Sequence, residues 1–170
     1  MSQNLQNAEY WIKKLDLTPH PEGGYYKETF ASNDVISTST LERYRGKPRK
    51  AYTLIYYLLK SGQVSKFHLL QSDEIWNFYF GSTLTIHVIK EDGMYIEKKL
   101  GQDIERSESF QHAVEHGAWF GASVDGENSF ALVGCFVSPG FDFEDFEIGN
   151  MDYLLQSFPE HHNIIEKLMA

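Results

Sequence analysis

Short apolar segments rich in β-branched and aromatic residues follow one another through most of this chain. Turn residues separate them, and no helical pattern lies between them. This order indicates an antiparallel sandwich or barrel, because parallel strands need a long crossover between them. The expected strands are Tyr25–Phe30, Ala51–Leu59, Val64–Leu70, Glu74–Phe80, Leu84–Ile89, Met94–Leu100, Phe110–Glu115, Trp119–Ala122 and Phe130–Val137.

Helices are expected only at the two ends of the chain. An apolar stripe with helical spacing runs from Leu5 to Leu15, and the helix must end before Thr18-Pro19. Two further helices are expected at about Met151–Ser157 and Glu160–Leu168. With 170 residues, the chain is predicted to form a single domain, residues 1–170. It divides into an N-terminal helix (1–16), a β-rich body (24–149) and C-terminal helices (150–170).

Composition excludes several classes of protein. Fifteen Lys and Arg against 24 Asp and Glu give a net charge of −9, which argues against a nucleic-acid partner. No apolar run approaches the roughly 18 residues that cross a bilayer, so no membrane association is expected. The one cysteine, Cys135, excludes an internal disulfide and favours a reducing, cytoplasmic setting.

A histidine and a glutamate are spaced in the sequence so that they could form a functional pair. The pattern is Gly62-x5-His68-x-Leu70-x3-Glu74-x6-Gly81. Strand alternation places Lys66 on the face of His68, and Glu74 is expected to begin the antiparallel partner strand opposite that histidine. Such an imidazole–carboxylate pair can do acid/base work or begin a metal site.

This spacing resembles the first motif of the cupin superfamily, with Leu70 in place of its second histidine. The second cupin motif is only faintly present, and Phe120 stands at its histidine position. The chain is most similar to cupin family five, an uncharacterised group of RmlC-like jelly-roll proteins. The matching pieces are Leu17–Thr29, Ser65–Gly81, Leu100–Asp103, Gln111, Gly117–Ala122 and Leu132–Gly149. The resemblance implies a cupin-type double-stranded β-helix (jelly roll) over residues 24–149, with a ligand pocket inside the barrel and assembly as a homodimer.

The residues argue against a cofactor. A typical metal cupin supplies three histidines and one carboxylate, and at those positions this chain has only His68 and Glu74. Two protein ligands are fewer than catalytic zinc or iron sites normally use. A divalent metal would need a substitute histidine, His87, His112 or His116, pointing into the barrel.

A second resemblance is looser. The segment Glu22–Phe30 is similar to a segment of the metal-free deoxysugar-nucleotide 3,5-epimerases, although Gly23 replaces their arginine. It implies His68 as the base, Glu74 or Asp73 as the group that orients it, and a tyrosine as the acid. Tyr25, Tyr26, Tyr57 and Tyr79 are available, and we name Tyr26 as the candidate.

We therefore predict a protein that binds a small polar metabolite, sugar-like or similar, in the barrel pocket. The residues expected around the ligand are His68, Glu74, Tyr26, Lys66, Trp76, Gln111, Trp119 and Glu22. Three alternatives stay open: a metal-free sugar-nucleotide epimerase or isomerase with His68 as general base, a metal-dependent isomerase or dioxygenase, and a non-catalytic storage or scaffold role.

Two irregular stretches complete the prediction. Ala31–Lys50 is polar, ends in a basic run and is expected to be a long loop. Phe141–Ile148 alternates aromatic with acidic residues and is expected to pack across the barrel end or a dimer interface.

Overall fold

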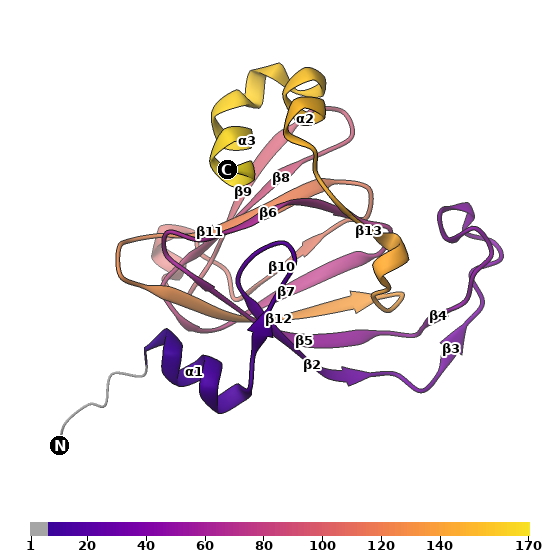
Figure 1. Cartoon of the computed structure of the whole chain (residues 1–170), viewed down its shortest axis with the longest axis horizontal. Coiled ribbons are helices and arrows are strands. Elements are labelled where there is room, and N and C mark those ends of the chain that lie inside the picture. The colour runs from indigo at the N-terminus through magenta and orange to yellow at the C-terminus, as the bar shows by residue number, and fades with distance from the viewer. Residues whose placement is uncertain (1–6) are drawn as a thin grey trace.

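Two antiparallel sheets face each other and form the body of the protein (Figure 1). The computed structural model describes residues 7–170. One sheet has six strands in the order β1-β2-β5-β12-β7-β10, and the other has five in the order β13-β6-β11-β8-β9. The main apolar core lies between them. The predicted jelly roll with terminal helices is confirmed.

The strand bounds agree closely with the sequence pattern. The strands of the body are β1 (Thr18–Pro19), β2 (Tyr25–Ala31), β5 (Thr53–Lys60), β6 (Val64–Leu70), β7 (Asp73–Gly81), β8 (Leu84–Ile89), β9 (Tyr95–Leu100), β10 (Gln111–Val114), β11 (Trp119–Val124), β12 (Phe130–Ser138) and β13 (Phe146–Ile148). One predicted pairing is wrong: β7 does not pair with β6. The link between them carries the chain across the barrel end, so β7 pairs with β12 and β10 in the six-stranded sheet.

An irregularity in β6 decides which of its side chains face inward. Phe120 of β11 lies opposite His68 and Ala122 lies opposite Ser65, so β6 has one extra residue in this interval. Such a bulge interrupts the alternation of faces. Phe67 packs into the cluster that contains Leu154 and Ile165 of the C-terminal helices, whereas Ser65 and His68 both reach Glu22.

Helices cover two opposite sides of the barrel (Figure 1). α1 (Ala8–Leu15) begins at Asn7, whose side chain accepts a hydrogen bond from the Tyr10 amide. Its apolar face packs on Leu58 and Leu132 of the six-stranded sheet. Residues 1–6 of the helix expected over 1–16 lie outside the described residues.

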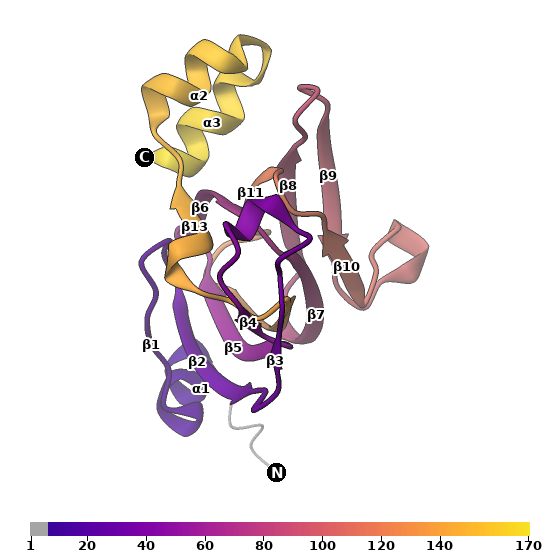
Figure 2. The same cartoon turned by 90° about the vertical axis from the view of Figure 1, so that its right-hand side faces the viewer.

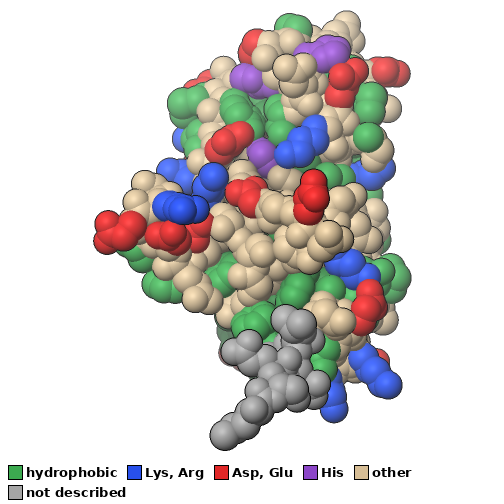
Figure 3. All heavy atoms as spheres, turned by 90° about the vertical axis from the view of Figure 1, so that its left-hand side faces the viewer, with side chains coloured by type: hydrophobic (Ala, Val, Ile, Leu, Met, Phe, Trp, Pro, Cys, Tyr) green, Lys and Arg blue, Asp and Glu red, His purple; other side chains and the backbone are tan. Residues whose placement is uncertain are grey.

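α2 (Met151–Ser157) and α3 (His162–Met169), joined by η4 (Pro159–His161), cover the five-stranded sheet. Within residues 7–170, no helix is long and apolar enough to cross a membrane. Acidic and basic side chains are interspersed on the face that Figure 3 shows.

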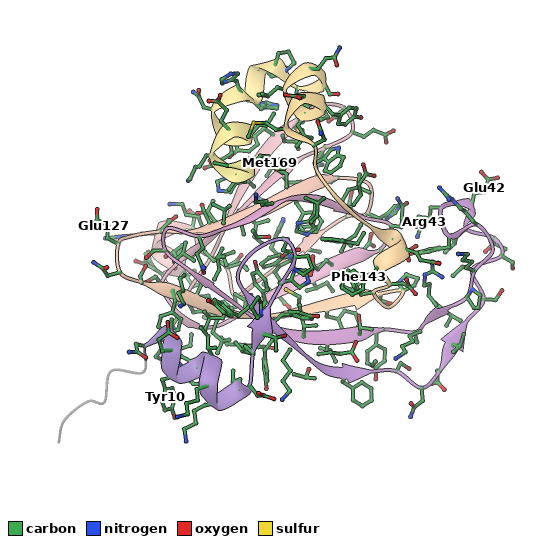
Figure 4. The ribbon with its side chains drawn as sticks, viewed as in Figure 1. Tyr10, Glu42, Arg43, Glu127, Phe143 and Met169 are labelled. Carbon is green, nitrogen blue, oxygen red and sulfur yellow. The ribbon has the colours of Figure 1, made fainter. Side chains whose placement is uncertain are left out.

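The stretch expected as a loop, Ala31–Lys50, contains a two-stranded arm (Figure 2). β3 (Val35–Ile36) pairs with β4 (Arg49–Lys50), and η1 (Glu42–Tyr44) lies between them. The arm meets η3 (Phe143–Asp145) at the end of the barrel, where Figure 4 labels Phe143 and Arg43. The buried Arg49 guanidinium donates to both carboxylate oxygens of Asp145, at 2.6 and 2.7 Å.

Breaking this ion pair should destabilise the barrel end. Asp145→Asn leaves the buried Arg49 with only the half-exposed Glu144, at 3.6 Å, as a counter-charge, and removing one member of a buried pair typically costs about 3–5 kcal/mol. We expect a loss of that size in the free energy of unfolding, measured by urea denaturation. The control is Lys47→Ala, because the neighbouring Lys47–Glu144 pair is more than half exposed and exposed pairs contribute about 1 kcal/mol or less. Equal losses in the two variants would contradict the anchoring role of Arg49.

Candidate functional site

A cavity of about 140 Å³ lies between the two sheets beside η3. One wall comes from β2, β5, β7 and β12 of the six-stranded sheet, and the other comes from β6. The loop before β2 and the segment around η3 close its end. The lining residues are His20, Glu22, Tyr26, Glu28, Thr53, Ile55, Tyr57, His68, Leu70, Glu74, Cys135, Val137, Phe141, Phe143 and Phe146.

His68 is held at the cavity wall by its backbone and by aromatic rings. Its Nδ1 lies 2.8 Å from the Lys66 carbonyl oxygen. Because a carbonyl only accepts, Nδ1 carries the proton, and Nε2 of the neutral ring is left as an acceptor. The rings of Phe120 and Phe146 lie 4.1 and 5.5 Å from the imidazole. Burial lowers the pKa of His68 to about 4, so the ring is neutral at pH 7.

The carboxylate beside His68 is Glu22, not the predicted Glu74. Glu22 Oε2 lies 3.3 Å from His68 Nε2, and the Ser65 hydroxyl donates to Oε1 at 2.9 Å. Gly23 makes this approach possible. Its φ is +115°, and a Cβ there would overlap the Val64 carbonyl oxygen. Burial raises the pKa of Glu22, which favours a proton shared with the imidazole over an ion pair.

Glu74 lies in the wall that belongs to the other sheet. The residue is 6% exposed, and among residues 7–170 Oε2 has no hydrogen-bond partner, although the Cys135 thiol and the Trp76 indole lie near the carboxyl group. Burial, followed by the charge of Glu22, raises the pKa of Glu74 to about 8. At pH 7 the cavity therefore holds a neutral imidazole and a protonated carboxyl group on facing sheets.

Of the other predicted site residues, two line the cavity and four do not. Tyr26 and Glu22 do. Trp76 is buried in the core, 5.7 Å from the Tyr57 ring. The bulge in β6 keeps Lys66 out of the lining.

Gln111 is exposed on β10, at the edge of the six-stranded sheet. Trp119 packs under the C-terminal helices with Leu154 and Ile165. Lys66, Trp76, Gln111 and Trp119, which were expected around the ligand, therefore do not line this cavity.

Three residues that line the cavity were not predicted from the sequence as members of the site, although Tyr57 was one of four candidate tyrosines. His20 lies in the turn before β2, with its ring 4.5 Å from that of Tyr26. Tyr57 donates to the Gly23 carbonyl oxygen at 2.9 Å. Cys135 faces Glu74, and burial raises the pKa of its thiol, so it stays protonated. Alternation along β5 and β12 identifies Tyr57 and Cys135 once the inward face is known, whereas no periodicity marks His20.

The residues present do not fit the metal site of a typical cupin. Within residues 7–170, no group of three or more His, Cys, Asp or Glu side chains is placed to hold an ion. Leu70 lines the cavity, and the Phe120 ring packs on His68. His112 and His116 line a separate open groove, and His87 bonds to Tyr95 and Ser123 on the other side of the five-stranded sheet. We derive no metal-dependent step.

Comparison with known proteins agrees with this architecture. The sequence model of the cupin superfamily group DUF985 matches residues 9–149. The chain belongs to this family. An uncharacterized protein of Saccharomyces cerevisiae is 31% identical over 155 residues, which cover 85% of this chain and 76% of the yeast protein.

Solved cupin structures include close and distant relatives. A hypothetical protein from Leishmania major has a TM-score of 0.88 at 40% identity, covering 95% of this chain and 97% of its own. A protein from Shewanella oneidensis has a TM-score of 0.87 at 39% identity, covering 96% and 98%. A Bacillus subtilis oxalate decarboxylase variant shares only the fold, with a TM-score of 0.54 at 12% identity over 85% of this chain and 35% of its own.

The raised pKa of Glu74 predicts a pH dependence of stability. In the unfolded chain this carboxyl loses its proton near pH 4.5, whereas in the folded protein it keeps it to about pH 8. The folded state therefore binds more protons between these values, and stability falls as pH rises. The buried His68 and His87, whose pKa values are lowered from 6.5 to about 4, have the opposite effect, and it becomes small above pH 7 because their imidazoles are then mostly neutral in the unfolded chain as well.

We expect the free energy of unfolding to fall by about 0.5–1 kcal/mol between pH 7 and 8. Glu74→Gln should remove this decline, and the exposed Glu147→Gln should retain it. Urea titrations at three pH values measure the slope. A slope in Glu74→Gln as steep as in the natural chain would show that another group titrates.

Proposed function

We propose that this cupin binds a small polar metabolite in the cavity between His68 and Glu74. The observation that carries the proposal is the Glu74 carboxyl, which is buried at the cavity wall and has one oxygen, Oε2, without a hydrogen-bond partner among residues 7–170. An unpaired buried polar atom costs about 1–3 kcal/mol. A ligand that hydrogen-bonds to it removes this cost.

The size of the cavity limits the ligand. Its 140 Å³ is about five times the roughly 30 Å³ that one water occupies in the liquid, and most drug-sized ligands need about 300–1,000 Å³. The enclosed space therefore suits a compound of about five to eight non-hydrogen atoms, and it does not suit a whole nucleotide sugar.

Ligand-induced stabilisation tests this proposal. At 100 times its dissociation constant, a ligand adds about 2.7 kcal/mol, or roughly 5–10 °C in Tm for a chain of this length. We expect such a shift from at least one member of a panel of small polyols, hydroxy acids, amino acids and amines. The shift should be lost in Glu74→Gln and in His68→Ala.

His87→Asn is the matched control, because His87 is equally buried but lies outside the cavity. It should lower the Tm of the free protein and leave the ligand-induced shift intact. No shift with any compound, or shifts that survive in both cavity variants, would refute the proposal.

One observation favours a second candidate, a metal-free isomerase or epimerase of small carbonyl compounds. The neutral His68 can act as a base, and either the protonated Glu74 or the Tyr26 hydroxyl can act as an acid. All three residues line one cavity. His68 would remove a proton from the carbon next to a carbonyl, and the acid would donate to the carbonyl oxygen. The Lys66 carbonyl oxygen, which accepts from Nδ1, would orient the base in place of the expected Glu74.

Exchange of that proton with solvent tests the second candidate. In D2O, NMR should show deuterium entering the position next to the carbonyl of a turned-over compound. General-base catalysis contributes about 10²–10⁴-fold, so His68→Ala should slow exchange by at least about 100-fold, with His87→Asn unaffected. Binding without any exchange would leave this protein a binding module.

Two expectations about the protein as a whole stay proposals. The outer face of the six-stranded sheet carries a stack of Phe30, Tyr52 and Phe136, with ring centroids 5.8 and 5.4 Å apart. Phe30 is half exposed, which supports the homodimer that the family resemblance implies. Cys135 is free and buried, which is compatible with a cytoplasmic setting.

A further inference from the structure

Several hydrogen-bond acceptors converge on the cavity. Among residues 7–170, Glu74 Oε2 has no hydrogen-bond partner. Nε2 of the neutral His68 is an acceptor that faces a second acceptor, Glu22 Oε2, at 3.3 Å. The Tyr57 hydroxyl is already used, because it donates to the Gly23 carbonyl oxygen. A proton on the Glu22 carboxyl would satisfy His68 Nε2 in the empty cavity, and a donor on a ligand could take its place.

The charge of the lining has one sign. Three of the fifteen lining residues are glutamates and none is lysine or arginine, although charges of both signs are interspersed on the face in Figure 3. An anionic ligand would bring a further negative charge beside these carboxyl groups. A phosphate or carboxylate ligand is therefore disfavoured inside this cavity.

The remaining wall is aromatic. Tyr26, Tyr57, Phe141, Phe143 and Phe146 all line the cavity, and the last three form a cluster with centroids 5.0–6.2 Å apart. Aromatic faces attract organic cations, and the attraction is stronger where water is excluded. Carboxyl groups and aromatic rings together are the surroundings in which an alkylammonium ion is stable.

We propose, on the basis that the cavity binds a small metabolite, that its ligand is a small organic cation, an ammonium compound. Its N–H groups lie among Glu74 Oε2, Glu22 Oε2 and His68 Nε2, and its carbon atoms contact the aromatic wall. An ammonium group carries three donors and no acceptor, so one such group can donate to all three of these atoms.

Binding of a cation is coupled to loss of a proton. The titratable groups that line the cavity around Glu74 are Glu22 and His20 from the loop, His68 from β6, Tyr57 from β5, Cys135 from β12, and Tyr26 and Glu28 from β2. Burial keeps the Glu74 carboxyl protonated in the empty cavity at pH 7. A positive charge next to it favours the carboxylate, so the proton leaves as the ligand enters.

Three probes of nearly equal size and different charge test the inference: ethanolamine, ethylene glycol and glycolate. Isothermal titration calorimetry at pH 7, in two buffers of different ionisation enthalpy, gives both the affinity and the number of protons released. We expect ethanolamine to bind at least tenfold more tightly than the other two and to release up to about one proton per site.

Two variants that each replace a glutamate with glutamine distinguish an effect at the binding site from an effect of the protein's overall charge. Glu74→Gln should weaken ethanolamine binding at least tenfold and abolish the proton release. Glu147 is exposed on β13 and does not line the cavity, so Glu147→Gln should leave the affinity and the proton count unchanged. Circular dichroism establishes that both variants are folded.

The outcomes distinguish this inference from the proposed function. Binding of ethylene glycol or glycolate that depends on Glu74, with ethanolamine no better, overturns the cationic ligand and leaves the metabolite-binding function standing. Ethanolamine binding that is unchanged in Glu74→Gln, or that releases no proton, also overturns the inference. If neither these probes nor any compound of the larger panel binds, both proposals fail.

Discussion

The approach of Glu22 to His68 is the contact on which the rest of the site depends. It brings a loop from the start of the chain against the interior of a strand that follows much later. Two backbone features permit it. Gly23, at a positive φ, passes directly over the Val64 carbonyl oxygen. The bulge in β6 turns Ser65 and His68 to the same side, so that both reach one carboxyl group. Without either feature, Glu22 would face solvent and His68 would face only phenyl rings.

The end of the cavity is held by different forces. The segment after β12 contributes Phe141, Phe143 and Phe146 to the lining, and Asp145 in its middle receives both hydrogen bonds from Arg49 of the arm. Most of the basic run that leads into β4 is thereby used within the protein. Lys47 bonds to Glu144, Arg43 donates to the Gln71 carbonyl oxygen, and Arg49 holds Asp145. These side chains fix the aromatic closure of the barrel instead of presenting an anion site.

The fold could be predicted far better than the site, for a physical reason. Alternation and turn residues are local signals, so the limits of β6 (Val64–Leu70) and β8 (Leu84–Ile89) follow from the sequence alone. The partner of His68 is a long-range property. Strand alternation predicted Lys66 beside His68, and it failed because a bulge leaves no local mark in the sequence. Trp119 was misplaced for a similar reason, since nothing in its own segment reveals that α3 covers that side of β11.

His68 and Glu74 are only six positions apart in the sequence, yet they belong to opposite sheets. The gap between them is therefore not set by the short connection that joins their strands. It is set by the thickness of the apolar layer, where Trp76 of one sheet meets Phe120 of the other edge to face at 6.5 Å. Trp76 acts in this arrangement as a spacer that fixes the width of the chamber. Relatives that carry a larger or smaller ring at these two positions would have a wider or narrower chamber between the same histidine and glutamate.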